Sequence, residues 1–112
     1  MKLIIKEYVS ANGRNYFREW LDSLTISVRA RVQARILRFE TGNLGDNKSV
    51  GRGVWEARIM IGPGYRIYFG KEGRSIILLL KGGDKASQAA DIRKARRLWR
   101  EYQEDKRYGT PH

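Results

Sequence analysis

The chain has 112 residues, 41% of them hydrophobic, with three tryptophans and no cysteine. This length predicts one domain over residues 1–112, and the lack of cysteine excludes disulfides, thiolate metal ligands and a cysteine nucleophile. Lys and Arg total 23 against 12 Asp and Glu, so the net charge is +11. This charge indicates that the protein binds a nucleic acid, an acidic protein partner or an anionic membrane. The alternative is a solvated basic surface that binds no polyanion.

The single histidine is the last residue, His112, which excludes imidazole catalysis and most zinc sites. No run of 18 apolar residues exists, and the apolar segment after Met1 is too short for a signal peptide. We therefore expect a cytoplasmic protein that works without membrane contact, metal or cofactor.

Two helices are predicted to follow a first strand. Lys2–Val9 is rich in aliphatic residues and predicts the strand, and Arg14–Leu24 carries apolar residues at helical spacing. A second helix is predicted to begin at Thr25 or Ser27, because apolar residues recur there at steps of three and four. Thr41–Gly53 contains four glycines and two asparagines and is predicted to be a loop.

Three strands joined by tight turns are predicted next. Apolar and polar residues alternate in Val54–Ile61 and Tyr65–Phe69, whereas Ser75–Leu80 is apolar on both faces and is expected to be the central strand. Gly82-Gly83-Asp84 is expected to end that strand, with Asp84 as the N-cap of a last helix over about Lys85–Glu104. The predicted order is β-α-α-β-β-β-α, an α+β fold with helices packed on one face of a mainly antiparallel sheet.

The alternation in the first two of these strands places four polar residues on one sheet face, which we expect to be exposed. Arg58 and Arg66 lie close to the turn that joins the strands, so both guanidinium groups are expected within reach of one phosphate. Tyr68 can stack on a base or polarise a hydroxyl, and Glu56 can accept a proton. The alternative is a cross-strand Glu–Arg salt bridge on a solvated face.

A second candidate site is Lys81-Gly82-Gly83-Asp84-Lys85. Backbone N–H groups at a helix start, opened by two glycines, are typical of an anion seat. Lys85 is expected in the first helical turn, where the helix dipole disfavours a cation, and Gln88 one turn later can add a hydrogen bond. The alternative is a lone exposed lysine.

The second predicted helix carries Arg31, Arg35 and Arg38 along one edge of its apolar stripe, and the last helix is also rich in arginine. These residues either bind a nucleic-acid backbone or an acidic peptide, or form a solvated helix face.

Over nearly its whole length the chain resembles the RelE/ParE superfamily of bacterial toxins, especially the HigB-like addiction module killer proteins. The matching segments are Phe17-x-x-Trp20-Leu21, Gly53-Val54-Trp55-Glu56-x-Arg58, Gly62–Phe69, Leu78–Leu80, Gly82–Lys85 with Gln88, Asp91-Ile92 and Leu98-Trp99. The Gly62–Phe69 and Gly82–Lys85 blocks are specific when they occur together.

The resemblance implies the toxin of a type II toxin-antitoxin system, neutralised by a small helix-turn-helix antitoxin that also brings it to operator DNA. It implies an endoribonuclease that cleaves mRNA on the ribosome without a metal, with the family's basic residues at Arg58, Arg66 and either Lys81 or Lys85. The predicted catalytic residues are Arg58, Arg66, Lys81, Lys85, Glu56 and Tyr68, and the predicted RNA-binding residues are Arg31, Arg35, Arg38, Lys85 and Gln88.

The chain departs from the ribonuclease pattern at two places. Glu56 stands where some relatives carry a second lysine, and Asp91 and Ile92 fall where ribonuclease members carry a helix tyrosine. These departures favour a second reading, a non-catalytic toxin that inhibits DNA gyrase. A third reading is a basic module that binds operator DNA together with its antitoxin.

Overall fold

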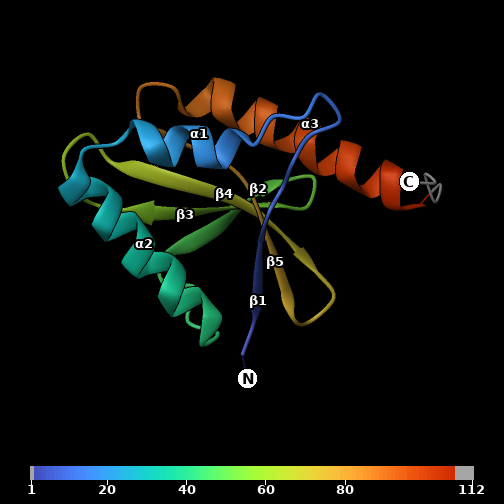
Figure 1. Ribbon diagram of the computed structural model, residues 1–112, viewed down its shortest axis with the longest axis horizontal. Helices are drawn as coiled ribbons and strands as arrows, with labels where there is room; N and C mark the ends of the chain where they lie inside the picture. Colours follow the sequence, from blue (N-terminus) through green and yellow to red (C-terminus); the bar gives the residue numbers. More distant parts are fainter. Residues whose placement is uncertain (1, 108–112) are drawn as a thin grey trace.

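The computed structural model describes residues 2–107, and the predictions that concern His112 lie outside the described residues. Within this range five strands and three helices follow in the order β-α-α-β-β-β-β-α (Figure 1). Their bounds are β1 Ile4–Glu7, α1 Tyr16–Ser23, α2 Ile26–Glu40, β2 Asn47–Gly51, β3 Val54–Ile59, β4 Tyr65–Glu72, β5 Ile76–Asp84 and α3 Gln88–Arg107. No helix of residues 2–107 is long and apolar enough to cross a membrane.

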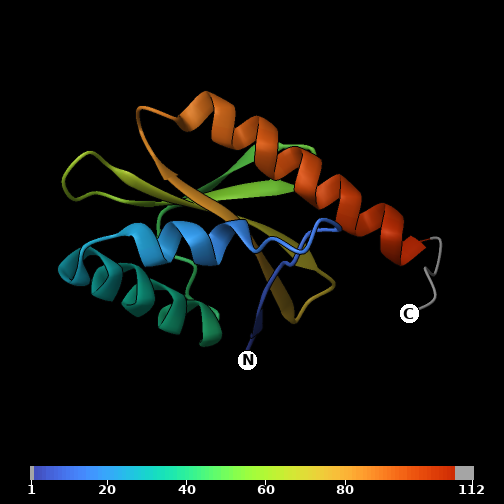
Figure 2. The same ribbon diagram turned by 45° about the horizontal axis from the view of Figure 1, so that its top comes forward.

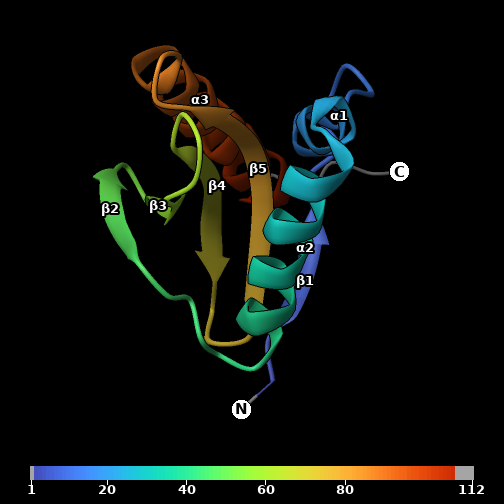
Figure 3. The same ribbon diagram turned by 90° about the vertical axis from the view of Figure 1, so that its left-hand side faces the viewer.

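The described strands form one sheet in the order β1-β5-β4-β3-β2, with β1 and β2 at its edges (Figure 3). β1 runs parallel to β5, and the other neighbouring pairs are antiparallel. The predicted α+β class with a mainly antiparallel sheet is therefore confirmed. β4 is the middle strand in place of β5, although β5 is interior, as its apolar sequence indicates.

Helices cover both faces of the sheet, so the prediction that they pack on one face is wrong (Figure 2). One core lies under α1 and α2 and includes Phe17, Phe39 and Phe69. A second core lies under α3 and includes Leu80 and Trp99. The cause is β5, whose apolar side chains point to both faces and need cover on each.

The predicted loop over Thr41–Gly53 contains the edge strand β2, which pairs antiparallel with β3. A two-residue Arg52-Gly53 turn joins the two strands, and Arg52 has a φ of 56°, in the left-handed region. Polar residues dominate β2, so backbone hydrogen bonds to β3 hold it in strand conformation. A local sequence pattern does not reveal this pairing.

β5 continues through Gly82 and Gly83 to Asp84, so the glycines do not end the strand as predicted. A Cβ at Gly82 would overlap the Trp20 indole, and a Cβ at Gly83 would overlap the Asp91 carboxylate. Both glycines therefore permit close packing of α1 and α3 against the sheet. Because α3 begins at Gln88, Lys85 precedes the helix and does not lie in its first turn.

Candidate functional site

Polar side chains gather on the sheet face that α3 covers, beside the apolar core under that helix. Residues paired on neighbouring strands present their side chains to the same face. One row across four strands consists of Lys48, Glu56, Tyr68 and Lys81. The next row pairs Arg58 with Arg66, as predicted, and Arg66 with Gly83.

A β-bulge brings Lys81 into the first row. Tyr68 pairs with Lys81 but the next residue, Phe69, pairs with Leu79, so Leu80 is the extra residue in β5. Without the bulge, strict alternation would turn Lys81 toward α1 and α2, together with Leu79. The bulge therefore places this cation on the face that carries Glu56 and Tyr68.

Glu56 is the centre of the cluster, and its side chain is 0% exposed. Its Oε2 atom accepts hydrogen bonds of 3.0 Å from the Tyr68 hydroxyl and 3.0 Å from Gln88 Nε2. Arg66 Nε lies 3.6 Å from the same oxygen, in an ion pair. Neither Arg66 Nε nor Glu56 Oε1 has a hydrogen-bond partner within the described residues.

The polar face is buried, so the expectation of an exposed face is wrong. Tyr68 and Glu56 are both 0% exposed and Arg66 is 7% exposed. The first half of α3 covers these side chains, with Gln88 reaching down to Glu56. Tyr68 therefore cannot stack on a base in this arrangement, and Glu56 is not reached by solvent.

Burial raises the pKa of Tyr68, and the neighbouring Glu56 charge raises it further, far above the usual value of 10. The phenol therefore stays neutral near pH 7 and donates a hydrogen bond to the Glu56 carboxylate. This phenol holds Glu56 in place, and Glu56 in turn lies against Arg66. The arrangement makes both residues positioning groups for the arginine.

A second buried carboxylate, Asp91 on α3, occupies the predicted anion seat. Its Oδ1 atom lies 3.3 Å from Lys81 Nζ, and its Oδ2 atom accepts a 2.5 Å hydrogen bond from Ser87 Oγ. The carboxylate sits directly over Gly83. The seat at Gly82-Gly83 is thus filled by the chain's own acidic group, and the prediction of a free phosphate site there is wrong.

Three cations lie at the edge of this cluster. Arg66 Nη1 donates to Gly64 O at 2.9 Å, which orients the guanidinium toward the turn between β3 and β4. Arg58 is half-buried and pairs with Asp46 at 3.2 Å. Lys85 is exposed and lies against Gly64, close to Arg66. Within residues 2–107 no group of three or more acidic, histidine or cysteine side chains could hold a metal ion.

No protein-family model matches the chain. An uncharacterized protein of Haemophilus influenzae (strain ATCC 51907 / DSM 11121 / KW20 / Rd) is 43% identical over 86 residues, which cover 76% of this chain and 87% of that protein. The chain belongs to the family of that protein. The aligned length reaches most of both proteins, so the relationship concerns the fold as a whole.

In this family member the structure unites most of the predicted site residues and separates the rest. Glu56, Arg58, Arg66, Tyr68, Lys81, Lys85 and Gln88 lie around the same part of the sheet. Arg31, Arg35 and Arg38 are on α2, which packs on the opposite face.

Arg35 has a structural role, so its prediction as an RNA-binding residue is wrong. The residue is 6% exposed, and burial lowers the pKa of its guanidinium. Its nitrogens donate to three backbone carbonyls, at 2.7 Å to Arg58, 2.8 Å to Asp46 and 3.1 Å to Leu44. Arg35 therefore ties α2 to the segment before β2 and to the end of β3, whereas Arg31 and Arg38 are exposed.

Replacing Arg35 with Met is expected to lower the free energy of unfolding by about 3 kcal/mol, because three partly buried carbonyls lose a charged donor. Arg38→Met is the matched control on the same helix, and it should change stability by less than about 0.5 kcal/mol. Urea unfolding at neutral pH measures both. Equal effects of the two substitutions would contradict the structural role of Arg35.

The sequence did not predict two residues that lie in the site, Lys48 and Asp91. Lys48 was assigned to a loop, and only the pairing of β2 with β3 places it beside Glu56. Asp91 was noticed only as a departure from the ribonuclease pattern, although its fourth-residue spacing from Ser87 was a helix-based signal for their contact.

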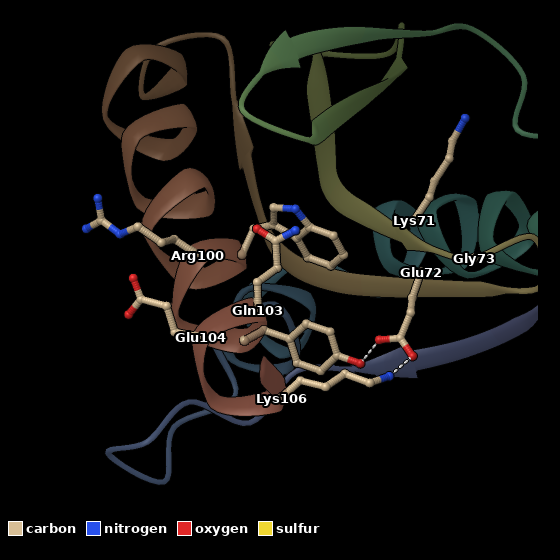
Figure 4. Close-up of a pocket in the computed structure, with 9 residues that line it drawn as sticks. Lys71, Glu72, Gly73, Arg100, Gln103, Glu104 and Lys106 are labelled. Carbon is tan, nitrogen blue, oxygen red and sulfur yellow. Dashed lines mark hydrogen bonds and ion pairs between the residues drawn. The ribbon is translucent and has the colours of Figure 1, made fainter. Parts of the chain in front are cut away.

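A separate pocket of about 610 Å³ lies between the second half of α3 and the turn from β4 to β5 (Figure 4). Its polar groups bond to one another: Glu72 accepts from the Tyr102 hydroxyl and pairs with Lys106. The Tyr102 ring also stacks on Trp99 at 5.5 Å. These contacts fasten the end of α3 to the sheet, so the pocket is a structural junction and not the candidate site.

Proposed function

We propose that this protein is the toxin of a type II toxin-antitoxin system, a HigB-like member of the RelE/ParE superfamily. Its proposed activity is metal-independent endoribonuclease cleavage of mRNA on the ribosome. The observation that carries the proposal is the buried Glu56 carboxylate with Arg66 against it, next to Arg58. A buried carboxylate that orients an arginine suits the stabilisation of a phosphorane.

The reaction needs no group beyond RNA and solvent. The 2′-oxygen gives its proton to solvent water and forms a bond to the adjacent phosphorus, while the bond from phosphorus to the 5′-oxygen breaks and that oxygen takes a proton from solvent water. The products are a 2′,3′-cyclic phosphate and a 5′-hydroxyl. Charge builds on the phosphoryl oxygens, and we assign its stabilisation to Arg66, Arg58 and Lys81.

Glu56, Tyr68 and Gln88 hold Arg66 and do not contact RNA in this proposal, which replaces the predicted role of Glu56 as a base. Lys85 is exposed beside Arg66 and binds a flanking phosphate. Glu56 and Tyr68 are both buried, and in this proposal catalysis depends on the ribosome for substrate positioning. The proposed location is therefore the cytoplasm.

The proposed partners are those of type II toxins. A small helix-turn-helix antitoxin with an acidic segment would neutralise the chain, whose net charge is +11, and would bring it to operator DNA.

Induced expression of this chain alone is expected to stop growth, and co-expression of an antitoxin encoded beside it should restore growth. The physical reason is continuous cleavage of translated mRNA by an enzyme without its inhibitor. Growth curves with expression verified by immunoblot measure this effect. Normal growth with abundant folded protein would remove the toxin assignment.

Inhibition of DNA gyrase is the second candidate, favoured by the burial of Glu56 and Tyr68. A poison that only binds needs no accessible proton-transfer group. Purified protein added to a gyrase supercoiling assay separates the candidates, because an endoribonuclease leaves supercoiling unchanged. Dose-dependent loss of supercoiling together with intact mRNA would favour the second.

A further inference from the structure

A groove lined by arginine runs along α3, outside the cluster around Glu56. It has a volume of about 580 Å³ and lies between α3 and the turn that joins β2 to β3. Its lining residues, called here the arginine groove, are Arg52, Arg93, Arg96, Arg97, Arg100 and Gln103. The α3 arginines recur at steps of three and four, so they share one side of the helix.

The groove concentrates positive charge. Arg52, Arg93, Arg97 and Arg100 are exposed, and none of these four forms an ion pair within residues 2–107. The turn holds Arg52 at a φ of 56° between two glycines, facing the helix arginines. Guanidinium groups gathered in this way repel one another, and a bound polyanion relieves that repulsion.

The floor of the groove is fixed. Arg96 donates from Nε to Val50 O at 3.0 Å and from Nη2 to the same carbonyl, which ties α3 to β2. Arg100 and Gln103 also line the neighbouring pocket, and in Figure 4 Arg100 points away from Glu72. Glu72, which pairs with Lys106, therefore does not neutralise the groove.

The groove leads toward the Glu56 cluster. Gln88, which bonds Glu56, lies eight residues before Arg96 on α3, about 12 Å along the helix. On the opposite wall, Lys48 lies on the same strand as Val50, whose carbonyl Arg96 holds. On the β2 side a cation, Lys48, therefore lies between the groove and the site.

We propose that the arginine groove binds the phosphate backbone of a single nucleic acid strand that extends from the Glu56 cluster. The lining favours phosphate over an acidic protein, because it contains no aliphatic or aromatic side chain to anchor a peptide. Arginine forks match phosphate oxygens two at a time. The inference rests on the proposed function only in taking that strand to be RNA, since binding itself needs no cleavage.

The test measures binding of a fluorescent 2′-O-methyl RNA, which lacks the attacking hydroxyl and cannot be cut. Anisotropy titrations at several NaCl concentrations compare the full-length chain with Arg97→Gln/Arg100→Gln. The matched control is Lys2→Gln/Arg74→Gln, which removes the same charge from exposed positions outside the groove. Circular dichroism and thermal unfolding verify the fold of each variant.

The groove variant is expected to bind roughly tenfold more weakly, and its log–log salt slope should fall by about 1.4, or 0.7 for each lost phosphate contact. The control should keep the slope of the unmodified chain. Equal slopes for the two variants would overturn the inference, as would polyglutamate binding more tightly than RNA and being lost in the groove variant.

Cleavage of unmodified RNA by the same proteins separates this inference from the proposed function. If the unmodified chain binds through the groove but cuts no RNA on ribosomes, the groove assignment stands and the nuclease fails. If it cuts RNA and the groove variant binds and cuts equally well, the groove assignment alone fails.

Discussion

Arg66→Ala is expected to reduce mRNA cleavage on programmed ribosomes by about 10²–10³-fold, because one transition-state donor is lost. Arg66 Nη1 is held by Gly64 O at 2.9 Å and Nε lies 3.6 Å from Glu56, so the guanidinium is oriented before substrate arrives. Single-turnover cleavage of a labelled message measures the rate. Arg74→Ala removes an exposed arginine at the turn between β4 and β5 and should leave the rate unchanged.

Arg66 is 7% exposed, so its replacement can also disturb folding. The variant therefore needs a measurement that separates loss of the guanidinium group from a folding defect. Millimolar guanidinium is expected to restore part of the activity to folded Arg66→Ala but not to Arg66→Lys, which fills the space with a cation lacking the fork. A folded Arg66→Ala protein that cleaves at the full rate would show that the site lies elsewhere.

Glu56→Ala is expected to lower the free energy of unfolding by about 3–5 kcal/mol, because it leaves a buried arginine without its partner. The Tyr68 hydroxyl and Gln88 Nε2 also lose their 3.0 Å acceptor. Urea unfolding measures the loss, with Glu104→Ala, an exposed α3 carboxylate, as the control. A loss below about 1 kcal/mol would contradict the central place of Glu56.

Glu56→Gln distinguishes positioning from proton transfer. If Glu56 only positions Arg66, replacing it with the isosteric amide should lower stability and modestly reduce the cleavage rate. The pH profile of cleavage should not change. If Glu56 is the general base, the same substitution should instead lower the cleavage rate of the folded protein by about 10²–10⁴-fold. The second outcome would restore the prediction that Glu56 accepts the proton.

The sequence predicted the meander and the neighbouring strand positions of Arg58 and Arg66, because alternation and short turns determine which residues face each other. Thr25 was correctly one of two candidates for the start of α2, since its side chain caps the helix at Val28 N. These are local properties of the chain, and local patterns report them.

The burial of the site could not be predicted in the same way. Alternation shows that Glu56 and Tyr68 share a face, but the crossing of α3 over that face depends on long-range packing around Trp99. The bulge at Leu80 likewise depends on pairing between β4 and β5, and it reverses the face on which Lys81 lies.

Two incorrect predictions, one for Gly82-Gly83 and one for Arg35, show how tertiary packing overrides local sequence patterns. Gly82 and Gly83 were interpreted as breakers, yet they stay in β5 because Trp20 and Asp91 need the space that side chains would fill. Arg35 looked like its exposed neighbours on α2, but its donors satisfy carbonyls from Leu44 to Arg58. In both cases at least one partner, Trp20 for Gly82 and Arg58 for Arg35, lies more than 20 residues away in the sequence.

Mapping of 5′-hydroxyl RNA ends in cells expressing the wild-type chain or Arg66→Ala, at equal levels of folded protein, tests the central claim most directly. The account predicts new 5′-hydroxyl ends within translated coding regions soon after induction of the wild-type chain, and their loss with the variant. No new ends in growth-arrested cells, or ends that persist unchanged with Arg66→Ala, would contradict it.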